Sequence, residues 1–296
     1  EQRARATFAF DDKERTNWHF VPLQDPARRP TRKGLPLEDM NATQQQAALA
    51  LLRAGTSASG DQKALTIMSL ENILKELEKG GAMVRNPHWY FFTVFGQPSS
   101  TGKWGWRVEG HHLCLNFVID RDKVVAATPA IFGANPAIVL SGPRKGLRTL
   151  PEVEDLARDL IKSLDEDQKK VAHQKEQFPE IQQATAHQDV GPPRGLPASK
   201  MNAGQLDLLV GLLDSYAHRM KPDVAEVELG QVKEAGIDNL YFAYAGGVGP
   251  GQAHTYRIQG PTFVVEFLNV QADSAGNPAN HIHSGWFHLK NDLGVE

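Results

Sequence analysis

The 296-residue sequence contains one cysteine, Cys114, and this scarcity excludes two kinds of structure. An intramolecular disulfide cannot form, and a zinc knuckle built on several cysteine ligands is ruled out. A single cysteine fits a reducing compartment, but many exported proteins of this size also need no disulfide. Cysteine content therefore leaves the localisation open.

Long apolar runs and an excess of positive charge are missing too. No stretch approaches 18 consecutive apolar residues, so no segment is predicted to span a membrane. The formal net charge is −3, and the basic run at 28–33 is short and broken by proline. We therefore expect no general attraction to nucleic acid or to an anionic membrane.

Familiar catalytic signatures are also absent. The glycine-rich stretch 246–251 lacks both the Lys-Ser/Thr pair and the following helix of a phosphate-binding loop. Neither a Gly-x-Ser-x-Gly elbow nor a His-Glu-x-x-His motif occurs. Stretch 246–251 is better interpreted as a flexible turn.

The chain does contain two pairs of similar segments. GLPLEDMNATQ at 34–44 matches GLPASKMNAGQ at 195–205, and each leads into a leucine-rich helical pattern. Downstream, WRVEGHHLCLNF at 106–117 aligns with YRIQGPTFVVEF at 256–267, and both patterns are typical of β-strands. Because the two matches recur in the same order at comparable spacing, we interpret them as an internal duplication.

The duplication predicts an α+β fold with two lobes related by approximate twofold symmetry, each containing a hairpin, with helices packed outside. Residues 1–33 hold three prolines and little periodicity, so we expect them to wrap the surface. The first lobe is predicted at 34–150 and the second at 200–296. Between them, 151–199 begins with a helix that runs from Pro151 through Gln168 and continues as a loop rich in Gln, Pro and Gly.

The differences between the two halves point to functional residues. His111 and His112 align with Pro261 and Thr262, so the shared fold does not require these histidines. His281 and His283 form a second pair near the C-terminus.

Strand alternation predicts how these histidines are arranged. Residues two apart share a face, so Glu109 and His111 are expected on one side of their strand and His112 on the other. His281 and His283 would likewise point together and could bind one ion. We predict His111, His281 and His283 as metal ligands, with Glu109 as a ligand or general base and His112 in support. Zinc, iron and copper fit such a set equally well. Hydrogen-bonded structural histidines and metal-free catalysis remain alternatives.

Three further charged residues are candidates for contact with a substrate. Glu266 lies in an apolar strand, so it must be paired with Arg257 or Arg107, or be functional. Arg257 and Arg148 could hold an anionic group through paired hydrogen bonds.

Four motifs along the chain resemble a large, mostly bacterial family that is known only as a domain of unknown function, numbered thirty-five hundred. They are WGWRVEGHHL at 104–113, TPAIFGANP at 128–136, YRIQGP at 256–261 and NHIH at 280–283. The resemblance implies export for many members, and it implies no activity. This chain has Phe287-His288 where the family tends to have Arg-Asp, and it stops at Glu296 where many members run on to His-Tyr.

These observations favour a metal-dependent enzyme, either a hydrolase or an oxygen-using oxidoreductase, that acts on a small or oligomeric substrate. The alternative is a non-catalytic module that binds a carbohydrate or another envelope component. In that case Trp104, Trp106 and Tyr256 would be its stacking surfaces.

Overall fold

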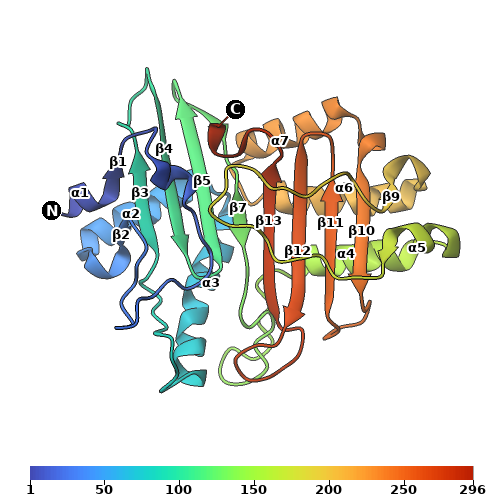
Figure 1. Ribbon diagram of the computed structural model, residues 1–296, viewed down its shortest axis with the longest axis horizontal. Coiled ribbons are helices and arrows are strands. Elements are labelled where there is room, and N and C mark those ends of the chain that lie inside the picture. Colours follow the sequence, from blue (N-terminus) through green and yellow to red (C-terminus); the bar gives the residue numbers. More distant parts are fainter. Residues whose placement is uncertain (296) are drawn as a thin grey trace.

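The computed structural model describes residues 1–295 and shows one sheet with helices on a single face (Figure 1). The predicted α+β class is confirmed. Glu296, the last residue of the predicted second lobe, lies outside the described part. The main path of the sheet, in spatial order, is β1 (Thr7–Phe8), β3 (Phe91–Phe95), β4 (Lys103–Gly110), β5 (Leu113–Asp120), β7 (Ala130–Phe132), β13 (His281–His288), β12 (Phe263–Gln271), β11 (His254–Gln259), β10 (Tyr241–Gly246) and β8 (His173–Gln174).

Three short strands attach beside this path. They are β2 (Leu35–Pro36) on β3, β6 (Lys123–Ala126) on β5 and β9 (Leu196–Pro197) on β10. The strands of both predicted lobes belong to one continuous sheet, because β7 pairs antiparallel with β13 at Gly285 and Ile131. The lobes therefore share one sheet.

The helices begin where the sequence places capping residues. α2 (Ala42–Gly55) and α6 (Ala203–Ala217) each start with a capping box, formed by Asn41 and Gln44 in one and Asn202 and Gln205 in the other. The prediction of one helix from Pro151 through Gln168 is wrong at Leu164 and Asp165, where the helix is interrupted. α4 (Pro151–Ser163) ends first, and Asp165 then caps a new helix, α5 (Glu166–Ala172). The remaining helices are α1 (Gln2–Ala6), α3 (Ala58–Leu77) and α7 (Pro222–Ala235).

The strand pairs that carry the similar sequence segments have similar registers in the two predicted lobes. Leu35 lies opposite Phe92 between β2 and β3, and Leu196 lies opposite Phe242 between β9 and β10. In the central hairpins, Trp106 faces Phe117 and Tyr256 faces Phe267, each as stacked rings. The order strand, two helices and then an antiparallel run of strands thus occurs twice along the chain.

The face of the sheet opposite the helices is crossed by two irregular segments, 13–33 and 175–195, which we call the two straps (Figure 1). They meet above the middle of the sheet, where the Trp18 indole N–H donates to the carbonyl of Thr185 and the Ala184 N–H donates to the carbonyl of Trp18. Beneath them a small apolar core includes Trp18, Phe20 and Phe287, all fully buried. The larger core lies between the sheet and the helices.

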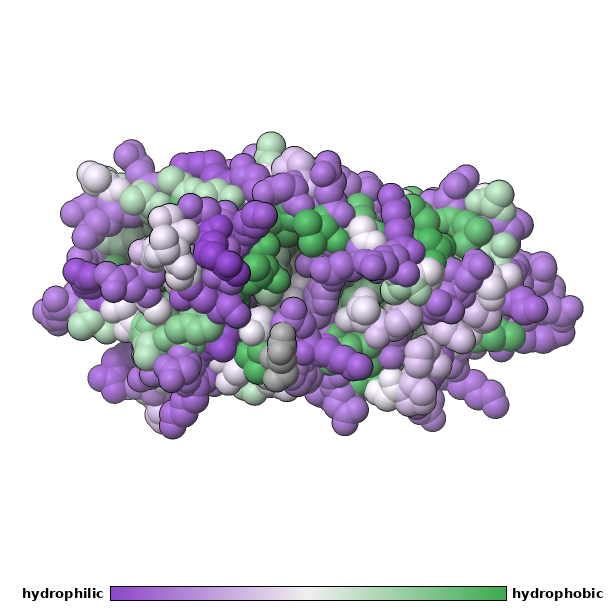
Figure 2. Space-filling view, turned by 90° about the horizontal axis from the view of Figure 1, so that it is seen from above, coloured by the Kyte–Doolittle hydropathy of each residue, from purple (hydrophilic) through white to green (hydrophobic). Residues whose placement is uncertain are grey.

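In the view from above, hydrophilic side chains cover most of the surface, and hydrophobic residues gather in smaller patches near its middle (Figure 2). No helix within residues 1–295 has both the length and the apolar character needed to cross a membrane.

The turn between α2 and α3 packs against the turn that follows α6. The Ser57 N–H donates to the carbonyl of Arg219, and a Cβ atom on Gly60 would lie 1.9 Å from that same oxygen. We therefore expect Gly60→Ala to separate these turns and to lower the free energy of unfolding by about 3 kcal/mol. Gly211, in α6, has open space around its Cβ position, so Gly211→Ala should instead stabilise by about 0.5–1 kcal/mol. Urea denaturation of both variants tests this contact, and equal effects would contradict it.

Candidate functional site

The candidate site begins at the hairpin turn that joins β4 to β5. This turn consists of His111 and His112, and His112 has a left-handed backbone with φ of 64°. The prediction that side chains continue to alternate between the two faces of a strand through His111 and His112 is therefore wrong, because the strand ends at Gly110. The turn is fixed by two backbone hydrogen bonds, from His112 N–H to the Phe20 carbonyl and from Gly133 N–H to the His112 carbonyl.

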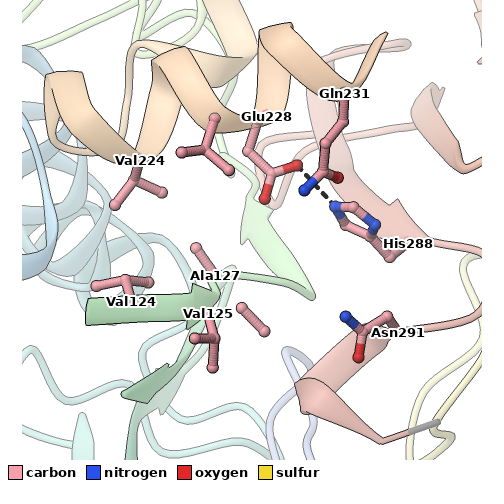
Figure 3. Close-up of a pocket in the computed structure, with 10 residues that line it drawn as sticks. Val124, Val125, Ala127, Val224, Glu228, Gln231, His288 and Asn291 are labelled. Atoms are coloured by element: carbon pink, nitrogen blue, oxygen red, sulfur yellow. Dashed lines mark hydrogen bonds and ion pairs between the residues drawn. The ribbon is translucent and has the colours of Figure 1, made fainter. Parts of the chain in front are cut away.

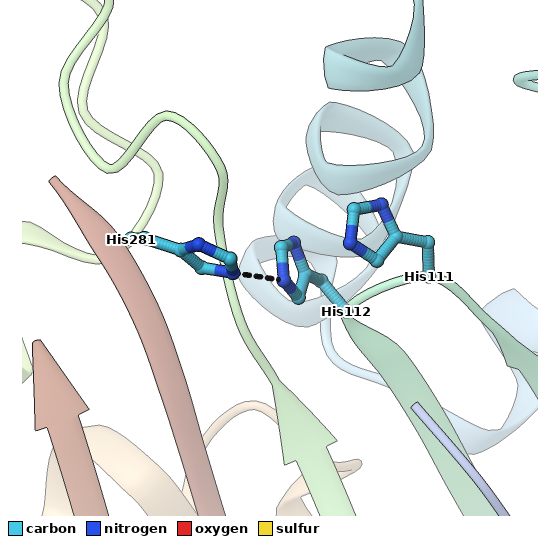
Figure 4. Close-up of side chains that lie close together, drawn as sticks. All are labelled: His111, His112 and His281. Carbon is cyan, nitrogen blue, oxygen red and sulfur yellow. Dashed lines mark hydrogen bonds between the residues drawn. The ribbon is translucent and has the colours of Figure 1, made fainter. Parts of the chain in front are cut away.

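Three histidine side chains converge at this point. The Nε2 atom of His112 lies 2.8 Å from that of His281 and 3.2 Å from that of His283, and the last two are 3.1 Å apart. His112 and His283 are buried, whereas His281 is partly exposed. Figure 4 shows the rings of His281 and His112 meeting through these nitrogens, with His111 beside them.

Hydrogen bonds alone cannot satisfy this triangle. An Nε2 atom that carries a proton can donate but has no free lone pair, and one without a proton can only accept. Among three such atoms, at least one pair must set two donors or two acceptors against each other. For His283, the Nδ1 atom lies 2.8 Å from the Glu180 carboxylate and donates to it, so in the neutral ring the lone pair is on Nε2. A cation between the three nitrogens would resolve the conflict.

The electrostatic environment favours the neutral form of the His112 and His281 rings. Burial, reinforced by the neighbouring histidines, lowers the pKa of His281 to about 3 and places the pKa of His112 well below its ordinary value. Neutral imidazole is the form that binds metal ions.

His111 occupies a separate position next to the triangle. Its Nδ1 atom lies 2.5 Å from Glu71 on α3 and 3.2 Å from the Arg85 guanidinium. Its ring stacks on that of His112 with centroids 3.8 Å apart. His111, His112 and His281 each offer a ring nitrogen, all within 4.8 Å of one another. The predicted proximity of His111 to the C-terminal histidine pair is thus confirmed.

The sequence profile of the family described as "Protein of unknown function (DUF3500)" matches residues 1–295. The chain belongs to this family. No curated protein and no solved structure matches it.

Sequence reasoning missed two carboxylates next to the histidines. Glu71 lies on the buried face of α3, among Ile67, Leu70 and Leu74. A charged residue within the apolar face of a predicted helix could have identified it as a candidate site residue. Glu180 comes from the second strap, about 100 residues away from His283 in sequence, and no local pattern marks it.

The structure does not bring Glu109 to the histidines. Its carboxylate lies 3.0 Å from Arg107, accepts the His19 N–H and is 3.7 Å from Arg32, under the first strap. Because β4 ends one residue later, Glu109 and His111 do not share a strand face.

The remaining predicted charged residues also have partners elsewhere in the DUF3500 fold. Glu266 pairs with Arg257 at 2.5 Å, as the structural alternative required, and Arg257 also donates to the Val190 carbonyl. Arg148 donates to Asp155 and Glu154 at the start of α4. Two of the three predicted stacking surfaces are corrected as well, because Trp106 and Tyr256 are buried and offer no exposed face, whereas Trp104 is partly exposed.

A second candidate site is a pocket between β6 and α7 (Figure 3). It is lined by valines and contains His288, which hydrogen-bonds to Glu228 at 2.7 Å. This pocket shares no lining residue with the histidine triangle. Its single imidazole makes it the weaker candidate.

Next to this pocket, Asp292 is buried and accepts the His288 N–H. Burial raises the pKa of Asp292 to about 7. Since the folded pKa lies above the unfolded one, the folded state binds this proton more tightly, and stability falls as the pH rises through 7.

We expect Asp292→Asn to remove this loss, so that its stability relative to wild type increases by on the order of 2 kcal/mol between pH 5 and pH 8. Asp122→Asn at an exposed turn is the control and should show no such trend in urea denaturation. A pH-independent difference for Asp292→Asn would show that the carboxylate is already ionised at pH 5.

Proposed function

We propose that this DUF3500 protein is a metal-dependent hydrolase in which Nε2 of His112, His281 and His283 holds one first-row divalent ion. The observation that carries this proposal is the triangle of nitrogens 2.8–3.2 Å apart. Bonds of about 2.0–2.1 Å to a tetrahedral zinc ion would place the ligand nitrogens roughly 3–3.5 Å apart. The side chains therefore already stand near the spacing that a shared ion requires.

The surroundings of the triangle support the same function. The Glu180 carboxylate orients His283 through Nδ1, as carboxylates do behind many metal-bound histidines. This arrangement exchanges two roles relative to the sequence-based hypothesis: His112 becomes a ligand and His111 becomes its neighbour.

Three protein ligands leave a fourth position for water, which is the arrangement of catalytic rather than structural zinc sites. His111 lies beside this position, with Nδ1 engaged by Glu71, so its Nε2 can accept a proton from such a water. The resulting hydroxide would attack an electrophilic carbon or phosphorus, and the proton would pass from His111 to the leaving group.

Hydrolysis fits the donor set better than oxygen chemistry does. The triangle contains no carboxylate, whereas non-haem iron oxygenases use two histidines and one carboxylate. The Glu71–His111 pair, in turn, supplies the base that hydrolysis needs. Burial of Trp106 and Tyr256 also weakens the alternative of a carbohydrate module that stacks sugars on these rings.

Metal content tests the proposal directly. Protein produced without a histidine tag should contain close to one first-row metal ion per chain in elemental analysis. His281→Ala and His283→Ala should lose it, and Glu180→Gln should weaken metal affinity by roughly 10–100-fold, because that residue only orients a ligand. The control is His218→Ala, at an exposed position, which should retain the metal. A chromogenic panel of esters, phosphoesters and amides should show activity that chelation abolishes. Metal-free wild type that also fails to take up zinc would overturn the proposal.

We also propose that the chain arose by duplication and that the halves correspond to lobes at 34–150 and 200–296, joined by 151–199. Support comes from the matching registers of β2–β3 with β9–β10 and of β4–β5 with β11–β12. The two straps would then be equivalent segments that precede each lobe.

Gly34 and Gly195 test this equivalence. Both have positive φ, 92° and 96°, and a Cβ atom on either would come within 3.0 Å of a carbonyl in the neighbouring strand, Phe92 or Phe242. We expect Gly34→Ala and Gly195→Ala each to lose at least about 2 kcal/mol of stability. Gly80→Ala, also at positive φ but in open space, should lose less because only backbone strain acts there. Thermal and urea denaturation measure all three, and a neutral effect at only one of the paired positions would speak against equivalence.

A further inference from the structure

A pocket that no step of the proposed chemistry uses lies beside the C-terminal end of α3, and we call it the basic pocket. It has a volume of about 220 Å³. Four of its eight lining residues are cationic, namely Arg28, Lys75, Lys79 and Arg85, and one is acidic, Glu78. The lining therefore has a net charge of +3, whereas the whole chain has a net charge of −3.

Most of this positive charge is not neutralised by ion pairs. Glu78 binds Arg85 through both carboxylate oxygens, one at 2.6 Å from Nε and the other at 3.0 Å from Nη2. Arg28, Lys75 and Lys79 take part in no ion pair within residues 1–295. Three positive charges thus line one pocket without a carboxylate partner.

The end of the helix accounts for only part of this arrangement. Lys75 lies in the last turn of α3, where the helix dipole favours a cation. Arg28 comes from the first strap, with Nη2 3.5 Å from the Met83 carbonyl, and Arg85 comes from the segment before β3. Cations from three separate segments therefore line one pocket, which is the pattern expected of an anion-binding site.

The charges favour a compact anion with two negative charges. Lysine ammonium and arginine guanidinium groups are common partners of phosphate oxygens. A phosphate monoester carries close to two negative charges at pH 7, whereas a single carboxylate would offset only one of the three unpaired cations. The overall charge of −3 opposes binding to a large anionic surface such as a membrane, so a small phosphorylated compound fits better.

Arg85 connects the basic pocket to the histidine centre. Its side chain is 10% exposed, and Nη1 lies 3.2 Å from Nδ1 of His111, the proposed base. The same guanidinium binds Glu78 within the pocket lining. A ligand that contacts Arg85 in the pocket is therefore one side chain away from the proposed base.

We propose that the basic pocket binds a phosphate group, and that this group is a part of the substrate that the histidine centre does not hydrolyse. The assignment to the substrate rests on the proposed hydrolase, whereas phosphate binding itself does not.

Titration calorimetry with the full chain tests the binding step. The protein is first treated with a chelator, so that phosphate cannot bind through an ion at the histidine triangle. Inorganic phosphate should bind, and acetate should bind at least about tenfold more weakly because it carries half the charge or less. Absence of phosphate binding, or equal affinity for acetate, would overturn the proposal.

Two exposed lysines of the lining make this test independent of folding. Lys75→Gln/Lys79→Gln should weaken phosphate binding at least about tenfold. The matched control is Lys162→Gln/Lys233→Gln, which removes the same charge at exposed positions in the last turns of α4 and α7, outside the pocket. Its affinity should equal that of wild type. Equal affinities of the two double variants would place the phosphate elsewhere.

Phosphate groups are also present on lipid headgroups, and a sedimentation assay distinguishes this source. Vesicles that contain an anionic phospholipid should leave the protein in the supernatant. Sedimentation that depends on Lys75 and Lys79, combined with no binding of soluble phosphate, would overturn the proposal in favour of a membrane surface.

Pairs of chromogenic esters that differ only by a distal phosphate test the link to the substrate in metal-loaded protein. Wild type should have a KM at least about tenfold lower for the phosphorylated ester. Lys75→Gln/Lys79→Gln should reduce this preference to near one, while the control variant keeps it. Equal KM values for the two esters in wild type would show that the phosphate is not part of the substrate.

The two proposals fail separately. His283→Ala removes a proposed metal ligand that does not line the basic pocket, so it should lose metal but retain phosphate binding. If no metal binds and no ester is hydrolysed, but phosphate binding depends on Lys75 and Lys79, the hydrolase is wrong and the phosphate site stands. If esters are hydrolysed but phosphate does not bind, the phosphate site is wrong and the hydrolase stands.

Discussion

The pairing of β7 with β13 is the constraint on which the rest of the structure depends. It is short, with Ala130 and Ile131 opposite Trp286 and Gly285, yet it joins the strands of both halves into one sheet. Because β7 also pairs with β5, it brings the hairpin turn that holds His112 beside the beginning of β13, where His281 and His283 lie. Without this pairing, the two histidine pairs would lie in separate sheets.

Burial gives the juxtaposed histidines their chemical character. The straps cover the sheet here, so Phe20 packs edge-on against His283 and the second strap supplies Glu180. A buried ring nitrogen without a hydrogen-bond partner costs free energy. The three Nε2 atoms of the triangle cannot all be satisfied by hydrogen bonds to one another. The paired carboxylates of this face, Glu109 and Glu266, are instead neutralised by arginines. Within residues 1–295, the three Nε2 atoms of the triangle have hydrogen-bond contacts only with one another.

Much of the fold could be predicted from local sequence, but only part of the site. Helix starts at Asn41 and Asn202 follow from capping chemistry within a few residues, and His281 and His283 share a side because they are two apart in a strand. The placement of His112, rather than His111, against His281 and His283 could not be predicted, since it depends on one left-handed residue in a two-residue turn. The contact of Glu180 with His283 could not be predicted from the sequence either, because tertiary packing sets the position of the second strap.

The difference between the two hairpins explains why the histidines gather at one of them and not at the other. At the second hairpin, between β11 and β12, Pro261 and Thr262 stand where the first has His111 and His112, and they provide no imidazole. β7 has only three residues, whereas β13 has eight and carries its histidine pair at the end nearest the first hairpin. The pairing that joins the halves is thus built from unequal strands. It directs the longer one, with His281 and His283, toward the hairpin turn that carries His111 and His112.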